Sequence, residues 1–99
     1  MAINKGMSQI YGGDGIFVNA VDPGPTRSQR ILNLFEDMAK VNNTTPEELE
    51  KGFRQQIPIG RLGGMDEVAR VVTYLASDAS GHVNGTVLAV DGGMSKGLF

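Results

Sequence analysis

The 99-residue chain contains no cysteine and no tryptophan, and its only histidine is His82. Without cysteine there is no disulfide framework, and a lone histidine gives no basis for a zinc site, so we expect no bound metal. No apolar run approaches the roughly 20 residues that span a bilayer, and the first ten residues lack the apolar core of a secretory signal. We therefore expect an intracellular, cytoplasmic protein without a membrane partner.

An excess of charge of one sign is also missing, since the formal net charge is −2. This near balance leaves no basic patch for nucleic acid, and we expect no nucleic-acid partner. Glycine, by contrast, is abundant, with 14 residues in the chain against a usual share of about 7%. The glycines occur in pairs and motifs, which indicates sharp turns between regular elements.

Two short apolar runs bounded by turn residues, 16–21 (IFVNAV) and 86–90 (TVLAV), predict strands that are buried on both faces. Between them, the apolar spacing of residues 31–41 and 66–76 predicts two helices. The sequence from Thr45 to Glu48 (TPEE) is a capping box with proline at the first helical position, and it predicts a further helix that ends near Gln56.

Strands joined by helices indicate parallel pairing in an α/β sheet. The helix at 66–76 should pack on this sheet through Val68, Val72 and Leu75, which share one helical face. Two parallel strands cannot cover their own faces and edges, so we expect them to belong to a larger sheet.

Two of the four prolines flank Gly24 directly after the first predicted strand. Pro23 should end the hydrogen bonding of that strand, and Gly24 should let the backbone pass close to a ligand. Pro25 should leave the amides of residues 26–28 free at the mouth of a helix, where they can meet a carboxamide or a phosphate. The alternative is an ordinary strand-to-helix turn in which Ser28 is the helix cap.

Three stretches, GIFVNAVDPGPTRS, IPIGRLGGMDEVARVVTYLASDAS and NGTVLAVDGGMS, resemble in order and spacing the C-terminal part of short-chain dehydrogenase/reductases. The resemblance covers residues 15–95 and implies the C-terminal portion of a Rossmann-like, doubly wound parallel sheet, with residues 1–99 as one partial domain. It also implies an NAD(P)-dependent oxidoreductase for a carbonyl or alcohol substrate, with NAD or NADP as cofactor.

By this resemblance, the cofactor-binding residues are Pro23, Gly24, Thr26 and Ser28, which would form one wall of the nicotinamide pocket. Thr26 would offer backbone groups to the nicotinamide amide, and Ser28 would supply the hydroxyl for which the family usually has threonine. Residues 27–56 would be the family's variable substrate lid, whose apolar side chains either line a pocket or form a core.

Other polar residues receive a structural interpretation. Arg61, in the GRLG turn, and Asp91, before the double glycine, are expected to hold turns in place. His82 is interpreted as a loop residue, since nothing in the sequence supports a catalytic triad around it.

Much of the family's chemistry has no counterpart in these 99 residues, including the phosphate-binding glycine loop and the catalytic serine. The N-terminal MAINKG resembles the end of the Tyr-x-x-x-Lys motif, so Lys5 corresponds to the catalytic lysine, as a vestige, and Met1 stands in place of the tyrosine. That tyrosine's phenol would protonate the carbonyl oxygen. The link from Lys5 to Gly15 is also shorter than the family's long helix at this point.

We therefore expect a truncated chain that is inactive alone. The alternative is a non-catalytic remnant that binds another subunit. Because family members commonly assemble through their C-terminal region, the resemblance implies a homo- or hetero-oligomer.

Overall fold

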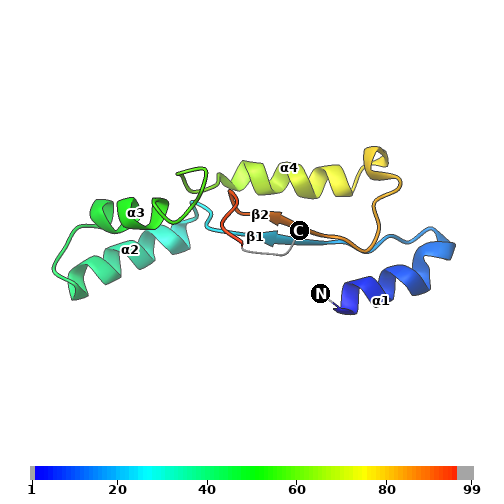
Figure 1. Ribbon diagram of the computed structural model, residues 1–99, viewed down its shortest axis with the longest axis horizontal. Helices are drawn as coiled ribbons and strands as arrows, with labels where there is room; N and C mark the ends of the chain where they lie inside the picture. Colours follow the sequence, from blue (N-terminus) through cyan, green and yellow to red (C-terminus); the bar gives the residue numbers. More distant parts are fainter. Residues whose placement is uncertain (1, 96–99) are drawn as a thin grey trace.

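The computed structural model describes residues 2–95, and its helices and strands follow the chain from α1 to β2 in Figure 1. The N-terminal part holds a helix, a 3₁₀ turn and the first strand: α1 (Ala2–Tyr11), η1 (Gly12–Asp14) and β1 (Ala20–Pro23). The remainder holds three helices, a second 3₁₀ turn and the second strand: α2 (Gln29–Val41), α3 (Pro46–Arg54), α4 (Met65–Leu75), η2 (Asp78–Ser80) and β2 (Val87–Val90).

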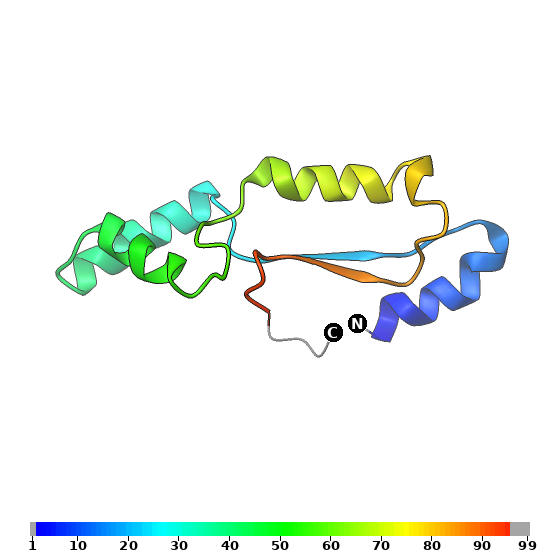
Figure 2. The same ribbon diagram turned by 45° about the horizontal axis from the view of Figure 1, so that its top comes forward.

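The two strands pair in parallel, with Ala20 opposite Val87 and Pro23 opposite Val90. The helices of the connection lie between them in sequence, so the predicted α/β class and parallel pairing are confirmed. Both views show α4 along one face of the pair and α1 on the other side, beside the amino ends of the strands (Figures 1 and 2). The carboxyl ends point toward α2 and α3.

The first strand begins at Ala20, four residues later than the predicted start at residue 16. Side-chain amides replace part of the ladder before that point: the Val18 N–H donates to Asn84 Oδ1, and the Thr86 N–H donates to Asn19 Oδ1, both at 3.0 Å. The segments still run side by side, since the Gly85 N–H donates to the Val18 carbonyl oxygen at 2.9 Å. Asparagine bonding thus shortens the regular strand without separating the two segments.

The prediction that Pro23 ends the strand's hydrogen bonding is wrong. The N–H groups of Ala20 and Gly24 donate to carbonyl oxygens of the partner segment, each at 2.9 Å. Because alternate residues of a strand point the same way, the Pro23 nitrogen faces away from β2. Its missing N–H therefore costs no bond to that strand, and pairing continues to Gly24.

The tightest core lies between α2, α3 and the turn that follows them, where Phe35, Ile57 and Leu62 are 3–6% exposed. The rings of Phe35 and Phe53 meet edge to face with centroids 5.8 Å apart, a favoured aromatic geometry. Partly buried residues pack around this cluster: Ile31, Leu49, Phe53 and Met94. Of the two roles left open for the lid's apolar residues, core formation therefore holds for Phe35.

Local signals set the helix ends. The Glu48 N–H donates to Thr45 Oγ1 at 3.2 Å and Pro46 is the first residue of α3, so the Thr45 half of the predicted capping box is confirmed. Within residues 2–95 the Glu48 side chain makes no return bond to the Thr45 amide, and the helix ends at Arg54, two residues early. At the start of α4, the Gly64 N–H donates to Glu67 Oε1 at 2.8 Å. These contacts satisfy amides that a helix N-terminus otherwise leaves unbonded.

The packing face of α4 differs in one position from the prediction. Val68 and Leu75 are partly buried as expected, but Val72 is 49% exposed and Val71 is partly buried in its place. The helix covers only two strands, so it has too little sheet beneath it to bury a full apolar stripe.

The described chain is elongated, with extents of 56 × 26 × 21 Å and a radius of gyration of 17.1 Å. A compact domain of this length has a radius of about 13 Å. The α2–α3 pair lies at one end and α1 at the other (Figure 1), so residues 2–95 do not close around a single core.

Candidate functional site

A cavity of about 670 Å³ opens beyond the carboxyl end of β1, between the proline–glycine segment, the start of α2 and the start of α4. It brings together all four predicted cofactor-binding residues, Pro23, Gly24, Thr26 and Ser28. The rest of the lining comes from Pro25, Arg30, Ile31, Leu34, Met65, Val68 and Ala69. Open α/β sheets bind ligands at this position.

Gly24 is required because its backbone lies against Asp91, the residue that follows β2. A Cβ at this residue would lie 2.7 Å from Asp91 Cα and closer still to Asp91 Cβ. The structure gives the glycine a reason within the chain, beside the predicted approach to a ligand, which stays a prediction. The close approach is between two backbone segments, and it fixes one wall of the cavity.

Of the three amides predicted to be free, two are bonded. The Arg27 N–H donates to the Gly63 carbonyl oxygen at 2.8 Å, and the Ser28 N–H donates to the Thr26 carbonyl oxygen at 2.8 Å. The Gly63 N–H in turn donates to Pro25 O at 2.9 Å, so the GRLGG turn forms a short parallel bridge with the loop. Within residues 2–95, the Thr26 N–H is the one amide of the three without an acceptor.

Ser28 is the cap of α2, as the alternative interpretation expected. Its backbone is extended and its Oγ accepts from the Ile31 N–H at 3.3 Å. Capping uses the hydroxyl oxygen only as an acceptor, so the Ser28 O–H remains able to donate into the cavity. The cap and the predicted ligand contact are compatible.

Ion pairs fix the surroundings of the loop. Arg27 Nη1 lies 2.6 Å from Glu50 Oε1 on α3, which ties the loop to that helix. Arg61 binds Glu67 through two hydrogen bonds of 2.7 and 3.0 Å. The hydrogen bond from Arg61, together with the Gly64 amide, lowers the pKa of Glu67 to about 2. Arg61 is thus a structural residue, as predicted.

Asp91 also has the predicted structural role. Its Oδ1 accepts from the Gly93 N–H at 3.0 Å and its Oδ2 accepts from the Ser95 N–H at 2.9 Å. These bonds hold the double-glycine turn, in which Gly92 and Gly93 have φ values of 63° and 88°. That conformation is accessible to glycine at little cost.

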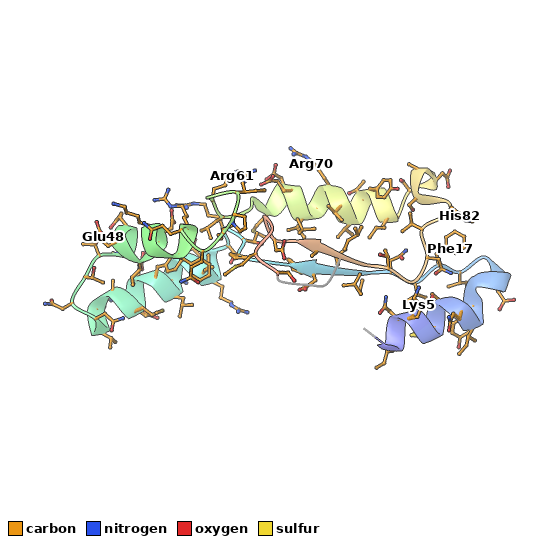
Figure 3. The ribbon with its side chains drawn as sticks, in the orientation of Figure 1. Lys5, Phe17, Glu48, Arg61, Arg70 and His82 are labelled. Atoms are coloured by element: carbon orange, nitrogen blue, oxygen red, sulfur yellow. The ribbon has the colours of Figure 1, made fainter. Side chains whose placement is uncertain are left out.

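Lys5 lies at the opposite end of the molecule from this cavity (Figure 3). Its Nζ is close to Gly85, where an added Cβ would lie 2.8 Å from it. The Gly85 N–H donates to the Val18 carbonyl oxygen, so Lys5 lies near Val18. Gly24 is six residues further along the extended chain than Val18, a distance of about 20 Å at roughly 3.3 Å per residue. The structure therefore does not bring Lys5 together with the four cofactor-binding residues, and Met1 is outside the described residues.

The described residues offer little further catalytic or metal-binding chemistry outside the cavity. His82 is exposed in the loop after η2 (Figure 3). Among residues 2–95, no three His, Cys, Asp or Glu side chains lie together so that they could hold a metal ion. None of the described helices is both long enough and apolar enough to cross a membrane.

Sequence reasoning missed part of the cavity lining. Arg30 was within reach of such reasoning, because it follows the loop in the first turn of the next helix. Met65 and Ala69 were not, because α4 approaches the loop only in the folded chain.

Comparisons with known proteins agree on one family. Residues 1–95 match the family model described as enoyl-(acyl carrier protein) reductase. An acetoacetyl-CoA reductase of Shinella zoogloeoides is 33% identical over 93 residues, which are 94% of this chain and 34% of that protein. The chain therefore spans about a third of the length of the curated relatives it matches.

Two solved structures show the same arrangement. A short-chain dehydrogenase family protein from Francisella tularensis has a TM-score of 0.89 and 27% identity, over 94% of this chain and 38% of its own. An NADPH-dependent reductase involved in bacilysin biosynthesis has a TM-score of 0.87 and 26% identity, over 98% of this chain and 37% of its own. In both, the matched region is one part of a longer Rossmann-type chain.

Proposed function

Since this chain belongs to the short-chain dehydrogenase/reductase family, we propose that it forms the nicotinamide side of an NAD(P)-dependent oxidoreductase for a carbonyl or alcohol substrate. In this proposal residues 1–99 are part of one domain of that family. The observation that carries it is the cavity beyond β1, which is lined by Pro23, Gly24, Thr26 and Ser28 together. A similar structure described as NADPH-dependent supports the choice of cofactor.

The polar groups at the cavity fit a nicotinamide carboxamide. The Thr26 N–H has no acceptor within the described residues, and a buried or half-buried amide gains stability when a ligand oxygen accepts its hydrogen. Ser28 can donate its O–H beside it. A bound dinucleotide would supply the hydride, and these residues would hold and orient its nicotinamide ring.

We propose that the 99-residue chain alone neither binds NAD(P)H nor reduces carbonyls. A dinucleotide is held largely through its pyrophosphate, on a glycine-rich turn and a helix N-terminus near the first strand of the sheet. In this proposal the chain supplies the nicotinamide wall but not the family's phenol, because Met1 stands four residues before Lys5, where the motif has tyrosine. General acid–base catalysis contributes about 10² to 10⁴ in rate, and positioning of the cofactor contributes more.

Fluorescence titration of the chain with NADH and NADPH tests this proposal. We expect no saturable binding in the micromolar range, and no turnover on a panel of ketones. Micromolar binding by the isolated chain would contradict it.

A chimera tests the wall in its family context. Residues 15–95 replace the matching segment of the acetoacetyl-CoA reductase, and folding is checked by circular dichroism before NADH and NADPH are titrated. We expect dinucleotide binding that Thr26→Pro weakens about tenfold, because it removes one donor. Thr26→Ala keeps the amide and serves as the matched control. A folded chimera that binds neither dinucleotide would refute the assignment.

The outer face of α1 favours a second candidate, in which the chain is non-catalytic and binds another subunit. Ile3 and Ile10 are 80% and 70% exposed, and Met7 lies between them at helical spacing. We propose that this surface supports a homo- or hetero-oligomer, and that in either case the protein is cytoplasmic. Sedimentation of the chain should show self-association that Ile3→Lys with Ile10→Lys removes. A wild-type chain that stays monomeric at about 0.1 mM, well above a micromolar dissociation constant, would speak against a homo-oligomer.

A further inference from the structure

Arg30 differs from the other arginines of the chain. Arg27, Arg54, Arg61 and Arg70 each lie within 4.0 Å of a carboxylate oxygen. Arg30 has no such partner within residues 2–95, although it lines the 670 Å³ cavity. Its charge is therefore available to a ligand.

The rest of the cavity is apolar or uncharged, and none of its lining residues is acidic. Ile31 and Leu34 contribute from α2, and Met65, Val68 and Ala69 contribute from α4. A ligand pocket is typically an apolar surface with a few polar groups that fix the orientation of the ligand. Here one cation, the Ser28 hydroxyl and the free Thr26 amide are those groups, since the Thr26 hydroxyl already donates to the Gly24 carbonyl oxygen at 2.9 Å.

The position of Arg30 in its helix is unfavourable for the folded chain alone. It lies in the first turn of α2, which contains no acidic residue, and the positive end of a helix dipole disfavours a cation there. An anion in the cavity would reverse this effect, because it would be attracted both by the guanidinium group and by the helix N-terminus. Ser28 caps this helix through its oxygen and leaves its O–H for the same anion.

We propose that Arg30 binds an anionic oxygen group, a carboxylate or a phosphate, of a ligand whose apolar part lies between α2 and α4. The planar guanidinium fork matches both groups through paired hydrogen bonds. The inference rests on the proposed function, which offers two sources of the anion. One is a carbonyl substrate that carries an acid group, and the other is a phosphate of the dinucleotide.

The test records the side-chain Nε–Hε signals of the arginines in the 99-residue chain by ¹⁵N NMR. The chain is titrated with benzoylformate, with its neutral amide, and with inorganic pyrophosphate. We expect a saturable shift of the Arg30 signal with at least one anion and none with the neutral amide. A response to benzoylformate assigns the site to an acidic substrate, and a response to pyrophosphate alone assigns it to the cofactor phosphate.

Two variants complete the test, with binding followed on the backbone amides of Leu34 and Ala69. Arg30→Gln should weaken binding of the active anion about tenfold, as expected for loss of a charge-assisted hydrogen bond. Arg70→Gln removes an exposed arginine that pairs with Asp66, and it should leave binding unchanged. No response to either anion, or equal weakening by both variants, would overturn the inference. Because no nicotinamide or turnover is involved, this result is independent of the dinucleotide titrations.

Discussion

The two ends of the molecule bury their apolar residues to very different degrees. At the α2–α3 end, Phe35 and Ile57 are 5% and 3% exposed. At the sheet end, Ile16, Phe17 and Val72 remain 47–53% exposed. Two adjacent helices and the turn that follows them can close a small core with contacts that are mostly local in sequence. A two-stranded parallel sheet with a helix on one face cannot, because its other face and its edges need further strands or helices.

The largest difference in the free energy of unfolding should appear when one apolar side chain is truncated at each end of the molecule. Phe35→Ala should cost about 3–5 kcal/mol, because it leaves a cavity beside Phe53 and Ile57. Ile10→Ala, at a 70% exposed position, should change the free energy of unfolding by less than about 0.5 kcal/mol. Urea unfolding followed by circular dichroism measures both. Similar losses at the two sites would show that the ends are equally packed.

Glycine substitutions should have opposite signs in the two regions. Gly24→Ala should destabilise the end of β1 by about 1–3 kcal/mol, because its Cβ overlaps Asp91. Gly52→Ala, in the interior of α3 with no atom within 4 Å of the new Cβ, should stabilise by about 0.5–1 kcal/mol. The same denaturation experiment compares them. A neutral Gly24→Ala would mean that β1 and the Asp91 turn are not in close contact.

The helix cap at Thr45 should matter less than the core it serves. Thr45→Ala removes the acceptor of the Glu48 N–H, and loss of such a cap costs about 1 kcal/mol. Thr45→Ser keeps the hydroxyl and should retain most of that stability. Hydrogen exchange at the Glu48 amide reports the effect locally. Exchange in Thr45→Ala as slow as in wild type would indicate that Thr45 does not cap α3.

The smallest expected effect is the local loss of stability at the start of α4 when Glu67 is protonated at low pH. The pKa of Glu67 is lowered from 4.5 to about 2, chiefly by the Arg61 hydrogen bond. A carboxylate with a lowered pKa in the folded state stabilises that state above its unfolded pKa, and the contribution is lost as the pH falls. The protection factor of the Gly64 amide, which compares its exchange rate with the intrinsic rate at the same pH, should therefore fall as the pH is lowered from 4.5 to 2. Glu67→Gln should remove this pH dependence, and a variant with the wild-type profile would disprove the assignment.

Sequence reasoning located the elements whose signals are local. The apolar runs located both strands, although the regular part of the first begins at Ala20. The Thr45 cap located the start of α3, and the Ser28 cap, which was the alternative interpretation, located the start of α2. The proline–glycine loop lines the cavity, as the resemblance implied. It did not predict α1, because that helix presents its polar residues to the sheet. Asn4 and Ser8 are 8% and 3% exposed while its apolar residues face outward, which inverts the usual amphipathic pattern.

The amino-acid sequence by itself determined the turns, the three helices between the strands and the approximate places of both strands, because caps, glycines and periodicity act within a few residues of one another. Only the tertiary structure decided what surrounds the loop. The approach of Asp91 to Gly24, the bridge between Gly63 and Thr26, and the side of the cavity formed by α4 all join segments far apart in the chain. Such contacts depend on how the parallel strands and their crossover bring those segments together, and no local pattern records them.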